Sequence, residues 1–168
     1  MIASFNFVLE SYTKLALLLT TTGLPLINAS IPIPELNVHT NKELSKLSNY
    51  QFKIFDSKTS ESKQINNCEI VPTGDDTFFN AILNCKGVIC GAGFELPAEV
   101  LHLEKKLYVI PIGNQYEQVC NAEALIKMGV ESYHKFDGEH ILNWIDKEYK
   151  KISLNKICKV QDVLDQIN

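Results

Sequence analysis

The feature that most constrains the fold is a strand, turn and helix alternation that occurs twice within residues 87–130. An apolar strand over residues 87–90 leads through a turn with Gly91 and Gly93 into a helix that begins near Phe94. A second strand, residues 107–111, leads through a polar turn, residues 113–118, into a helix that Gly129 closes. Two such units predict parallel strands joined by crossover helices. Both turns should then open at the carboxyl edge of one sheet.

The same alternation extends over most of the chain. Hydrophobic periodicity predicts further strands near residues 27–34, 50–55, 69–71 and 132–136. Helices are expected over residues 40–47, from about residue 75, over residues 139–152 and over residues 159–167. Thr40 is the predicted N-cap of the first of these helices. Residues 56–67 are expected to form a polar loop. We therefore expect an α/β fold for residues 30–168: a Rossmann-like, open and mostly parallel sheet with helices on both faces.

Residues 1–29 are an apolar segment whose role the pattern does not define. Glu10 and Lys14 interrupt the apolar residues of this segment, and residues 5–19 predict an amphipathic helix. The uninterrupted apolar run is far shorter than the ~20 residues of a membrane span. No positively charged region precedes it, as a secretory signal requires. An apolar face here leaves open a partner subunit, self-association into a homo-oligomer, or contact with a membrane surface.

Composition excludes some classes of function. The formal net charge of -4 argues against a nucleic-acid surface, which needs clustered lysine and arginine. The five cysteines form no CxxC pair, and no histidine lies near them at zinc-ligand spacing, so we expect no metal site. An unpaired set of cysteines favours a reduced, cytoplasmic compartment, where the chain could also sit at the inner membrane face. Cys90 and Cys120 lie in apolar patterns and are expected to be core residues.

The first turn carries residue types that suit a phosphate-bearing ligand. Gly91 and Gly93 permit close approach to the backbone, and a helix N-terminus attracts an anion. Glu95 and Glu99 lie one helical turn apart. Like charges at this spacing cost a few tenths of a kcal/mol. In one interpretation the pair only complements the helix dipole. In the other, Glu99 accepts hydrogen bonds from the vicinal hydroxyls of a ribose.

The second turn strengthens the case for a polar ligand. Four amide or acid side chains crowd between a buried strand and a helix: Asn114, Gln115, Glu117 and Gln118. Amides donate and accept hydrogen bonds, and a carboxylate accepts strongly, so the cluster suits a hydroxyl-rich ligand. The alternative is an ordinary polar first turn of a helix, with Asn121 facing solvent.

These motifs resemble a known family. The run GAGFELPAE, followed by a strand and then GNQYEQxxNAxxLxxxGV, is similar to the C-terminal, donor-binding domain of GT-B fold glycosyltransferases. The relatives in question are the peptidoglycan N-acetylglucosaminyltransferase and related uncharacterised bacterial enzymes. The resemblance implies that Glu99 binds the ribose of a UDP-sugar and that Gly91, Ala92, Gly93 and Phe94 offer backbone amides to its pyrophosphate. It also implies that Glu117 and Gln118 reach the donor sugar, with Asn121 behind them.

The resemblance also implies an activity. This activity is the transfer of a hexose or N-acetylhexosamine by an inverting mechanism, in the synthesis of cell-envelope glycans. The UDP-sugar is then the donor substrate, and no cofactor is expected. The chain resembles only the donor half, so an acceptor domain or subunit would have to complete it, and no residue is predicted to be the general base. A non-catalytic module that binds a nucleotide or nucleotide-sugar is the alternative. A nicotinamide-dependent oxidoreductase is disfavoured, because Leu96 stands where GxGxxG needs its last glycine.

Overall fold

The computed structural model describes residues 16–18, 27–30, 38–56, 59–73, 75–112 and 115–152. Within them one sheet has the strand order β4-β5-β3-β1-β2-β6-β7-β8. Its strands are β1 Ala16–Leu18, β2 Ile27–Ser30, β3 Phe52–Asp56, β4 Lys63–Ile65, β5 Cys68–Pro72, β6 Gly87–Cys90, β7 Lys106–Val109 and β8 Glu131–Ser132. The helices are α1 Val38–Ser45, α2 Asp75–Asn84, α3 Glu95–His102, α4 Tyr116–Lys127 and α5 Gly138–Asp146.

Most of the sheet is parallel. β2 pairs in parallel with β6, β6 with β7, β7 with β8, and β3 with β5. β1 runs antiparallel to both β2 and β3 and lies between them, and β4 pairs antiparallel with β5 at the far edge. Without β1 and β4, the order β5-β3-β2-β6-β7-β8 is that of a doubly wound sheet.

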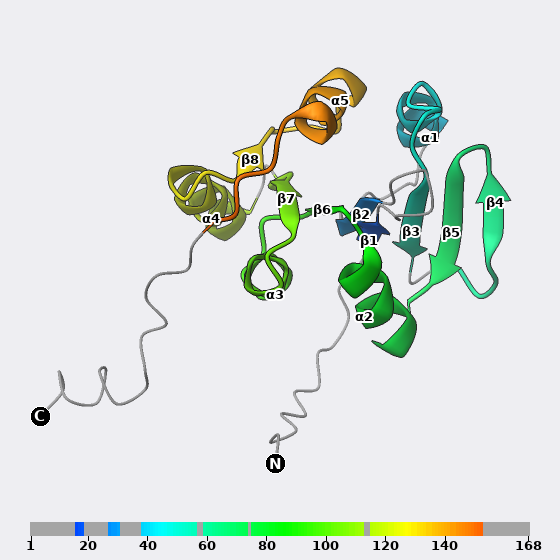
Figure 1. Cartoon of the computed structure of the whole chain (residues 1–168), viewed down its shortest axis with the longest axis horizontal. Helices are drawn as coiled ribbons and strands as arrows, with labels where there is room; N and C mark the ends of the chain where they lie inside the picture. Colours follow the sequence, from blue (N-terminus) through cyan, green and yellow to red (C-terminus); the bar gives the residue numbers. More distant parts are fainter. Residues whose placement is uncertain are drawn as a thin grey trace, which may run out of the picture.

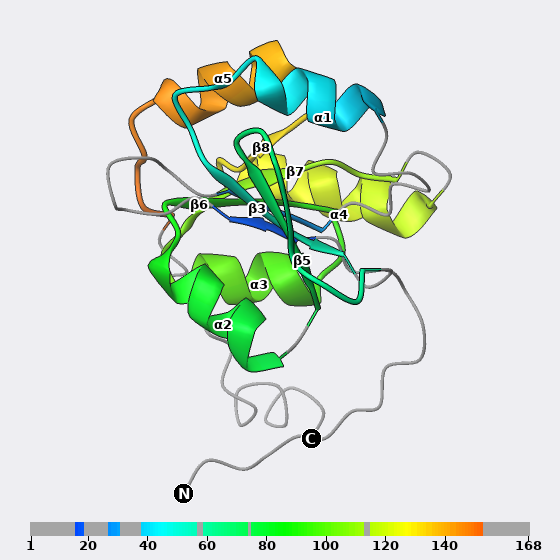
Figure 2. The ribbon, with the colours of Figure 1, turned by 90° about the vertical axis from the view of Figure 1, so that its right-hand side faces the viewer.

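The helices form layers on the two faces of this sheet, as expected from the alternation of strands and helices. Figure 2 shows α1 and α5 together on one face, and α2 and α3 on the opposite face. In Figure 1, α4 lies beside β8, at the edge of the sheet away from β4. The Rossmann-like α/β prediction is therefore confirmed.

In the core, α5 packs a tryptophan against β6 and β7. All four residues of β6 are buried, which is the continuous apolar run of a strand covered on both faces. Trp144 of α5 is 2% exposed and lies directly over Gly87. A Cβ at Gly87 would come within 2.9 Å of the indole ring, so only glycine fits there without a shift. The Tyr108 ring packs against the same indole at a centroid distance of 5.5 Å.

Buried Asn67 fixes the end of α1 against the sheet. Its side-chain Nδ2 donates to the carbonyl oxygens of Leu44 (2.9 Å), Leu47 (3.0 Å) and Tyr50 (3.0 Å). The end of a helix leaves carbonyl groups without intrahelical partners. A single amide from the β4–β5 turn therefore binds three carbonyls in the last turn of α1 and just after it.

Several boundaries differ from those predicted. Residues 16–18 form strand β1, so the helix predicted over residues 5–19 is wrong there. Thr40 lies inside α1, which begins at Val38, so Thr40 is not its N-cap. The predicted loop over residues 56–67 contains strand β4, whose three residues are all exposed and so give no hydrophobic alternation. β8 is shorter than predicted, and α5 ends at Asp146 rather than near residue 152.

Cys120 is exposed rather than buried, which corrects the core assignment made for it. The other described cysteines, Cys68, Cys85 and Cys90, are buried and unpaired. The helix predicted over residues 159–167 lies outside what the structure describes. No helix among the described residues has the length and apolar character to cross a membrane.

Candidate functional site

The topology places the two predicted turns together at one edge. The chain winds outward from β2 towards β3 on one side and from β6 towards β7 and β8 on the other, so the direction reverses between β2 and β6. In open α/β sheets, ligands bind outside the carboxyl ends of the strands at such a reversal. β6 ends there with Cys90, and the turn of residues 91–94 follows directly. The turn after β7 opens at the same edge because β6 and β7 are parallel.

The first turn is tightly seated but has open space on its outer side. Gly91 and Ala92 are buried, whereas Gly93 is partly exposed. Among the described glycines only Gly129 has a positive φ, so backbone strain does not explain Gly91 or Gly93. A Cβ at Gly93 would meet nothing within 4 Å. Nothing inside the fold requires glycine at this position, and its outer side is free for a ligand to approach closely.

The N-terminus of α3 follows this turn and carries free backbone donors. Phe94 is the N-cap, and no side chain caps the helix. Pro97 is the third helical residue and has no N–H to leave unpaired, so it helps to fix the start of the helix. The N–H groups of Glu95 and Leu96 belong to the first turn and have no intrahelical partner. They give the edge a small, positively polarised patch.

Side chains of α4 hold the two turns together. The Gln118 Oε1 accepts hydrogen bonds from the backbone N–H of Ala92 (3.2 Å) and of Ile112 (3.1 Å). Asn121 donates from Nδ2 to the carbonyl oxygen of Ala92 at 3.1 Å. Both backbone groups of Ala92 are therefore bound by α4, and the turn is fixed relative to the second loop. Gln118 also donates from Nε2 to the Oε1 of Gln115 at 2.8 Å.

We call the hydrogen bonds of Gln118 and Asn121 to Ala92 the clamp. The remaining predicted site residues lie on the surface around it. The carboxylates of Glu95, Glu99 and Glu117 are exposed, near the N-terminal ends of α3 and α4. Phe94 is 68% exposed. Asn114 lies outside the described residues, so its predicted role is untested by the geometry. The arrangement offers carboxylate acceptors, amides and backbone donors at one edge, which can bind a ligand with both hydroxyl and phosphate groups.

Two features of the site were not predicted from the sequence. Tyr116 is 84% exposed at the first position of α4, two residues from Gln118. A hydrogen bond with Cys120, one turn later, raises the pKa of Tyr116. The backbone N–H of Ile112 is the second donor to Gln118. An aromatic residue in an otherwise polar turn was the available signal for Tyr116, whereas no sequence signal pointed to the Ile112 amide.

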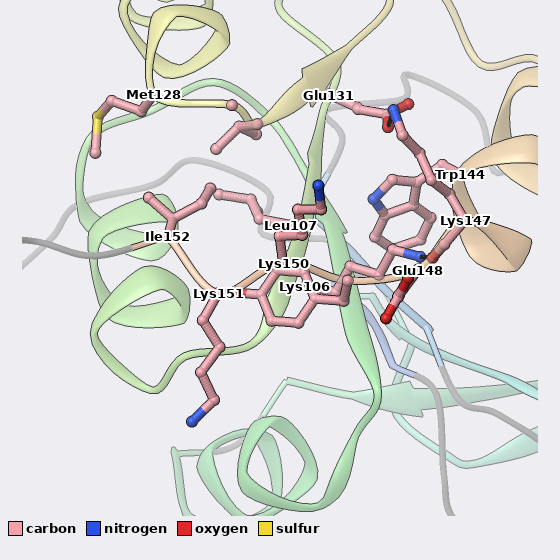
Figure 3. Close-up of a pocket in the computed structure, with 13 residues that line it drawn as sticks. Lys106, Leu107, Met128, Glu131, Trp144, Lys147, Glu148, Lys150, Lys151 and Ile152 are labelled. Atoms are coloured by element: carbon pink, nitrogen blue, oxygen red, sulfur yellow. Dashed lines mark hydrogen bonds and ion pairs between the residues drawn. The ribbon is translucent and has the colours of Figure 1, made fainter.

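Other groups near the site are unsuited to chemistry. Burial raises the pKa of the Cys90 thiol, directly before the first turn, so it stays protonated and a poor nucleophile. No group of three or more His, Cys, Asp or Glu side chains that could hold a metal ion occurs in the described ranges. A cavity of about 530 Å³ is present, but it lies at the amino ends of β7 and β8 and so at the opposite edge (Figure 3).

Fold and side chains together define a doubly wound α/β domain with a polar carboxyl edge. A family model described as "Glycosyl transferase family 1" matches residues 35–147, more than half of the chain. The match runs from before α1 through both turns to the end of α5. The chain therefore belongs to glycosyl transferase family 1. Comparisons with curated proteins and with solved structures gave no match.

Proposed function

We propose that the carboxyl edge of this domain binds the nucleotide-sugar donor of a glycosyl transfer reaction, and that this donor is a UDP-sugar. The observation that carries the proposal is the double clamp on Ala92 by Gln118 and Asn121, which joins both turns at the reversal point of the sheet. Membership of glycosyl transferase family 1 supports a nucleotide-sugar over other phosphate-bearing ligands.

The clamp narrows which backbone groups can bind the pyrophosphate. The N–H of Ala92 already donates to Gln118, so it is not available to a ligand. The donors that remain are the N–H groups of residues 93–96, which begin at the open side of Gly93 and end before Pro97. Helix N-termini bind phosphate through such groups, and here they would stabilise the charge that develops on the UDP leaving group.

The acidic residues supply the hydroxyl-binding groups of the proposed site. Glu99 accepts hydrogen bonds from the ribose hydroxyls, and Glu95 lies one helical turn closer to the phosphates. Glu117 and Gln115 face the donor sugar, and the sequence adds Asn114 to this proposed group. The acceptor hydroxyl attacks the anomeric carbon, and the acceptor and general base come from a further domain or subunit. The free thiols favour a cytoplasmic setting for this reaction.

Calorimetric titration of UDP, UDP-N-acetylglucosamine and NAD tests this function. We expect both UDP ligands to bind wild type and NAD not to bind. Glu99→Ala should weaken UDP binding about 10- to 100-fold, because hydrogen bonds to a charged group contribute about 1.5–3 kcal/mol. Glu123→Ala is the matched control, since Glu123 is another exposed glutamate but lies two turns along α4. Equal loss in both variants, or no UDP binding by folded wild type, would refute the assignment.

A second measurement separates transfer from binding alone. Release of UDP from UDP-N-acetylglucosamine is followed in the presence of candidate acceptors and of the completing domain or subunit. Turnover that depends on Glu99 supports a transferase. Tight binding without UDP release under every condition would instead favour a non-catalytic nucleotide-sugar binding module.

A further inference from the structure

The two most exposed of the large hydrophobic side chains that the structure describes both lie at the carboxyl edge of the sheet. Tyr116 is 84% exposed and Phe94 is 68% exposed, whereas the next, Phe79 of α2, is 53% exposed. Phe94 is the N-cap of α3, and Tyr116 is the first residue of α4. Hydrophobic residues scattered singly over a surface are normal. Two aromatic residues beside one polar edge are instead typical of a ligand-binding site.

Local structure does not account for either aromatic residue. An N-cap is usually Ser, Thr, Asp or Asn, whose side chain accepts a backbone hydrogen bond, and Phe94 has no such oxygen. The Tyr116 hydroxyl forms a hydrogen bond with Cys120, one turn along α4, while the residue as a whole stays exposed. What each residue leaves for a ligand is therefore an aromatic ring rather than a polar group.

The clamp fixes where these two residues lie relative to each other. Phe94 follows Ala92 by two residues, and Tyr116 precedes Gln118 by two residues. The Gln118 Oε1 accepts a hydrogen bond from the Ala92 N–H at 3.2 Å, so the starts of α3 and α4 are held together. A ligand whose phosphates bind the free N–H groups of residues 93–96 therefore has an aromatic residue close to it at the start of each helix.

We propose that Phe94 and Tyr116 are the apolar walls of the donor site, one on each side of the pyrophosphate. This inference rests on the proposed function. Tyr116 stands between Gln115 and Glu117 in the chain, so its ring packs on a face of the donor sugar. Phe94 caps the helix that carries Glu99, which takes the ribose, so its ring packs on the uracil base.

Both rings of the ligand suit an aromatic wall. The C–H groups on one face of a pyranose are weakly positive and pack on the electron-rich face of a tyrosine ring. Every nucleobase has a flat face that stacks on an aromatic side chain. The two walls then have different tasks, because Phe94 binds UDP with or without a sugar, whereas Tyr116 binds only a donor that still carries its sugar. After transfer, the UDP product lacks the contact with Tyr116, which favours its release.

Calorimetric titration of UDP, UDP-glucose, UDP-galactose and UDP-N-acetylglucosamine tests the two walls separately. Wild type should bind at least one UDP-sugar more tightly than UDP. Tyr116→Ala should reduce this preference about fivefold with no change in the affinity for UDP, and Tyr116→Phe should keep the preference because the ring remains. Phe94→Ala should weaken UDP and the UDP-sugar by the same factor, about tenfold.

Phe79→Ala is the matched control and should bind all four ligands as wild type does. Phe79 is also an exposed phenylalanine, but it lies in the middle of α2. All the substituted side chains are exposed, so circular dichroism should show an unchanged fold in every variant. Equal weakening in Phe79→Ala and in the two site variants would overturn the inference, because any exposed aromatic residue would then have the same effect.

The remaining outcomes separate this inference from the proposed function. A preference for UDP-sugars that survives Tyr116→Ala, or equal wild-type affinity for UDP and all three UDP-sugars, would overturn the role of Tyr116. Unchanged UDP affinity in Phe94→Ala would overturn the role of Phe94. In these cases UDP still binds, and the proposed function stands or falls with Glu99→Ala. Folded wild type that binds neither UDP nor any UDP-sugar would refute the proposed function and this inference with it.

Discussion

The clamp formed by Gln118 allows a quantitative prediction. Gln118→Ala leaves two backbone N–H groups without an acceptor. Ala92 is fully buried, so its unpaired N–H should cost about 2 kcal/mol, within the usual range for a stranded buried donor. Ile112 is only partly buried, so water can replace part of its bond, and its loss should cost about 1 kcal/mol. The free energy of unfolding should therefore fall by about 3 kcal/mol in total.

Gln118→Glu is the matched variant, because the carboxylate keeps an acceptor for both N–H groups. It loses only the donation to Gln115, whose exposed side chain can rotate and bind water instead. The cost should stay below about 1 kcal/mol. Gln115→Ala, which removes the same exposed contact from the other side, should cost about as little.

Urea unfolding at neutral pH, followed by circular dichroism, measures these differences. Amide exchange by NMR adds a local readout: the Ala92 and Ile112 amides should lose protection in Gln118→Ala and keep it in Gln118→Glu. If the alanine variant is within about 0.5 kcal/mol of wild type, the clamp does not hold the turn. The same conclusion follows if the glutamate variant is as unstable as the alanine variant.

Three further predictions concern stability and are measured by chemical denaturation. Asn67→Ala should cost about 2–3 kcal/mol, since three carbonyls lose one buried donor, whereas the exposed Asn84→Ala should cost little. Tyr108→Phe should be neutral or stabilising by up to about 1 kcal/mol, because the buried Tyr108 hydroxyl has no partner among the described residues. Asp137→Ala removes the N-cap of α5 and should cost about 1 kcal/mol at pH 7.

The Asp137 effect should depend on pH. The backbone N–H of His140, and then that of Glu139, hold the pKa of Asp137 below its ordinary value of 3.8. A depressed pKa in the folded state means that the contribution is fully present above the pKa of the unfolded chain. It is lost as the pH falls through the lowered folded value. The stability difference between wild type and Asp137→Ala should therefore vanish in strong acid, and a difference that persists there would show another cause.

The sequence predicted the central units well because their signals are local. The strand predicted over residues 87–90 matches β6, and the helix predicted from Phe94 begins one residue later. Glycines, Pro97 and apolar periodicity act over a few residues, so they can be recognised without knowing the fold. The prediction for β1 was wrong because a short apolar run is compatible with either a helix or a strand. Its strand state depends on pairing with β3, more than 30 residues later in the chain.

The meeting of the two turns at one edge was predictable from the sequence, but the hydrogen bonds that join them were not. Parallel pairing of β6 and β7 brings both turns to one edge, and that follows from the order of elements alone. The partners of Ala92 are 26 and 29 residues away, and no spacing rule indicates them. Exposure of Cys120 was missed for a similar reason, since an apolar pattern does not reveal which face of α4 the sheet covers.

The polar residues at the start of α4 lie on different faces of the helix and therefore have different roles. Gln118 and Asn121 are three residues apart, so they share one face, and that face is directed at the turn around Ala92. The oxygen of Gln118 is occupied by backbone donors, and only its Nε2 could be released to a ligand, by movement of the exposed Gln115. Glu117 lies off this face and is exposed. On the proposed function, choice among donor sugars should therefore depend on Glu117 and Gln115, whereas Asn121 should affect all donors equally through the position of the turn.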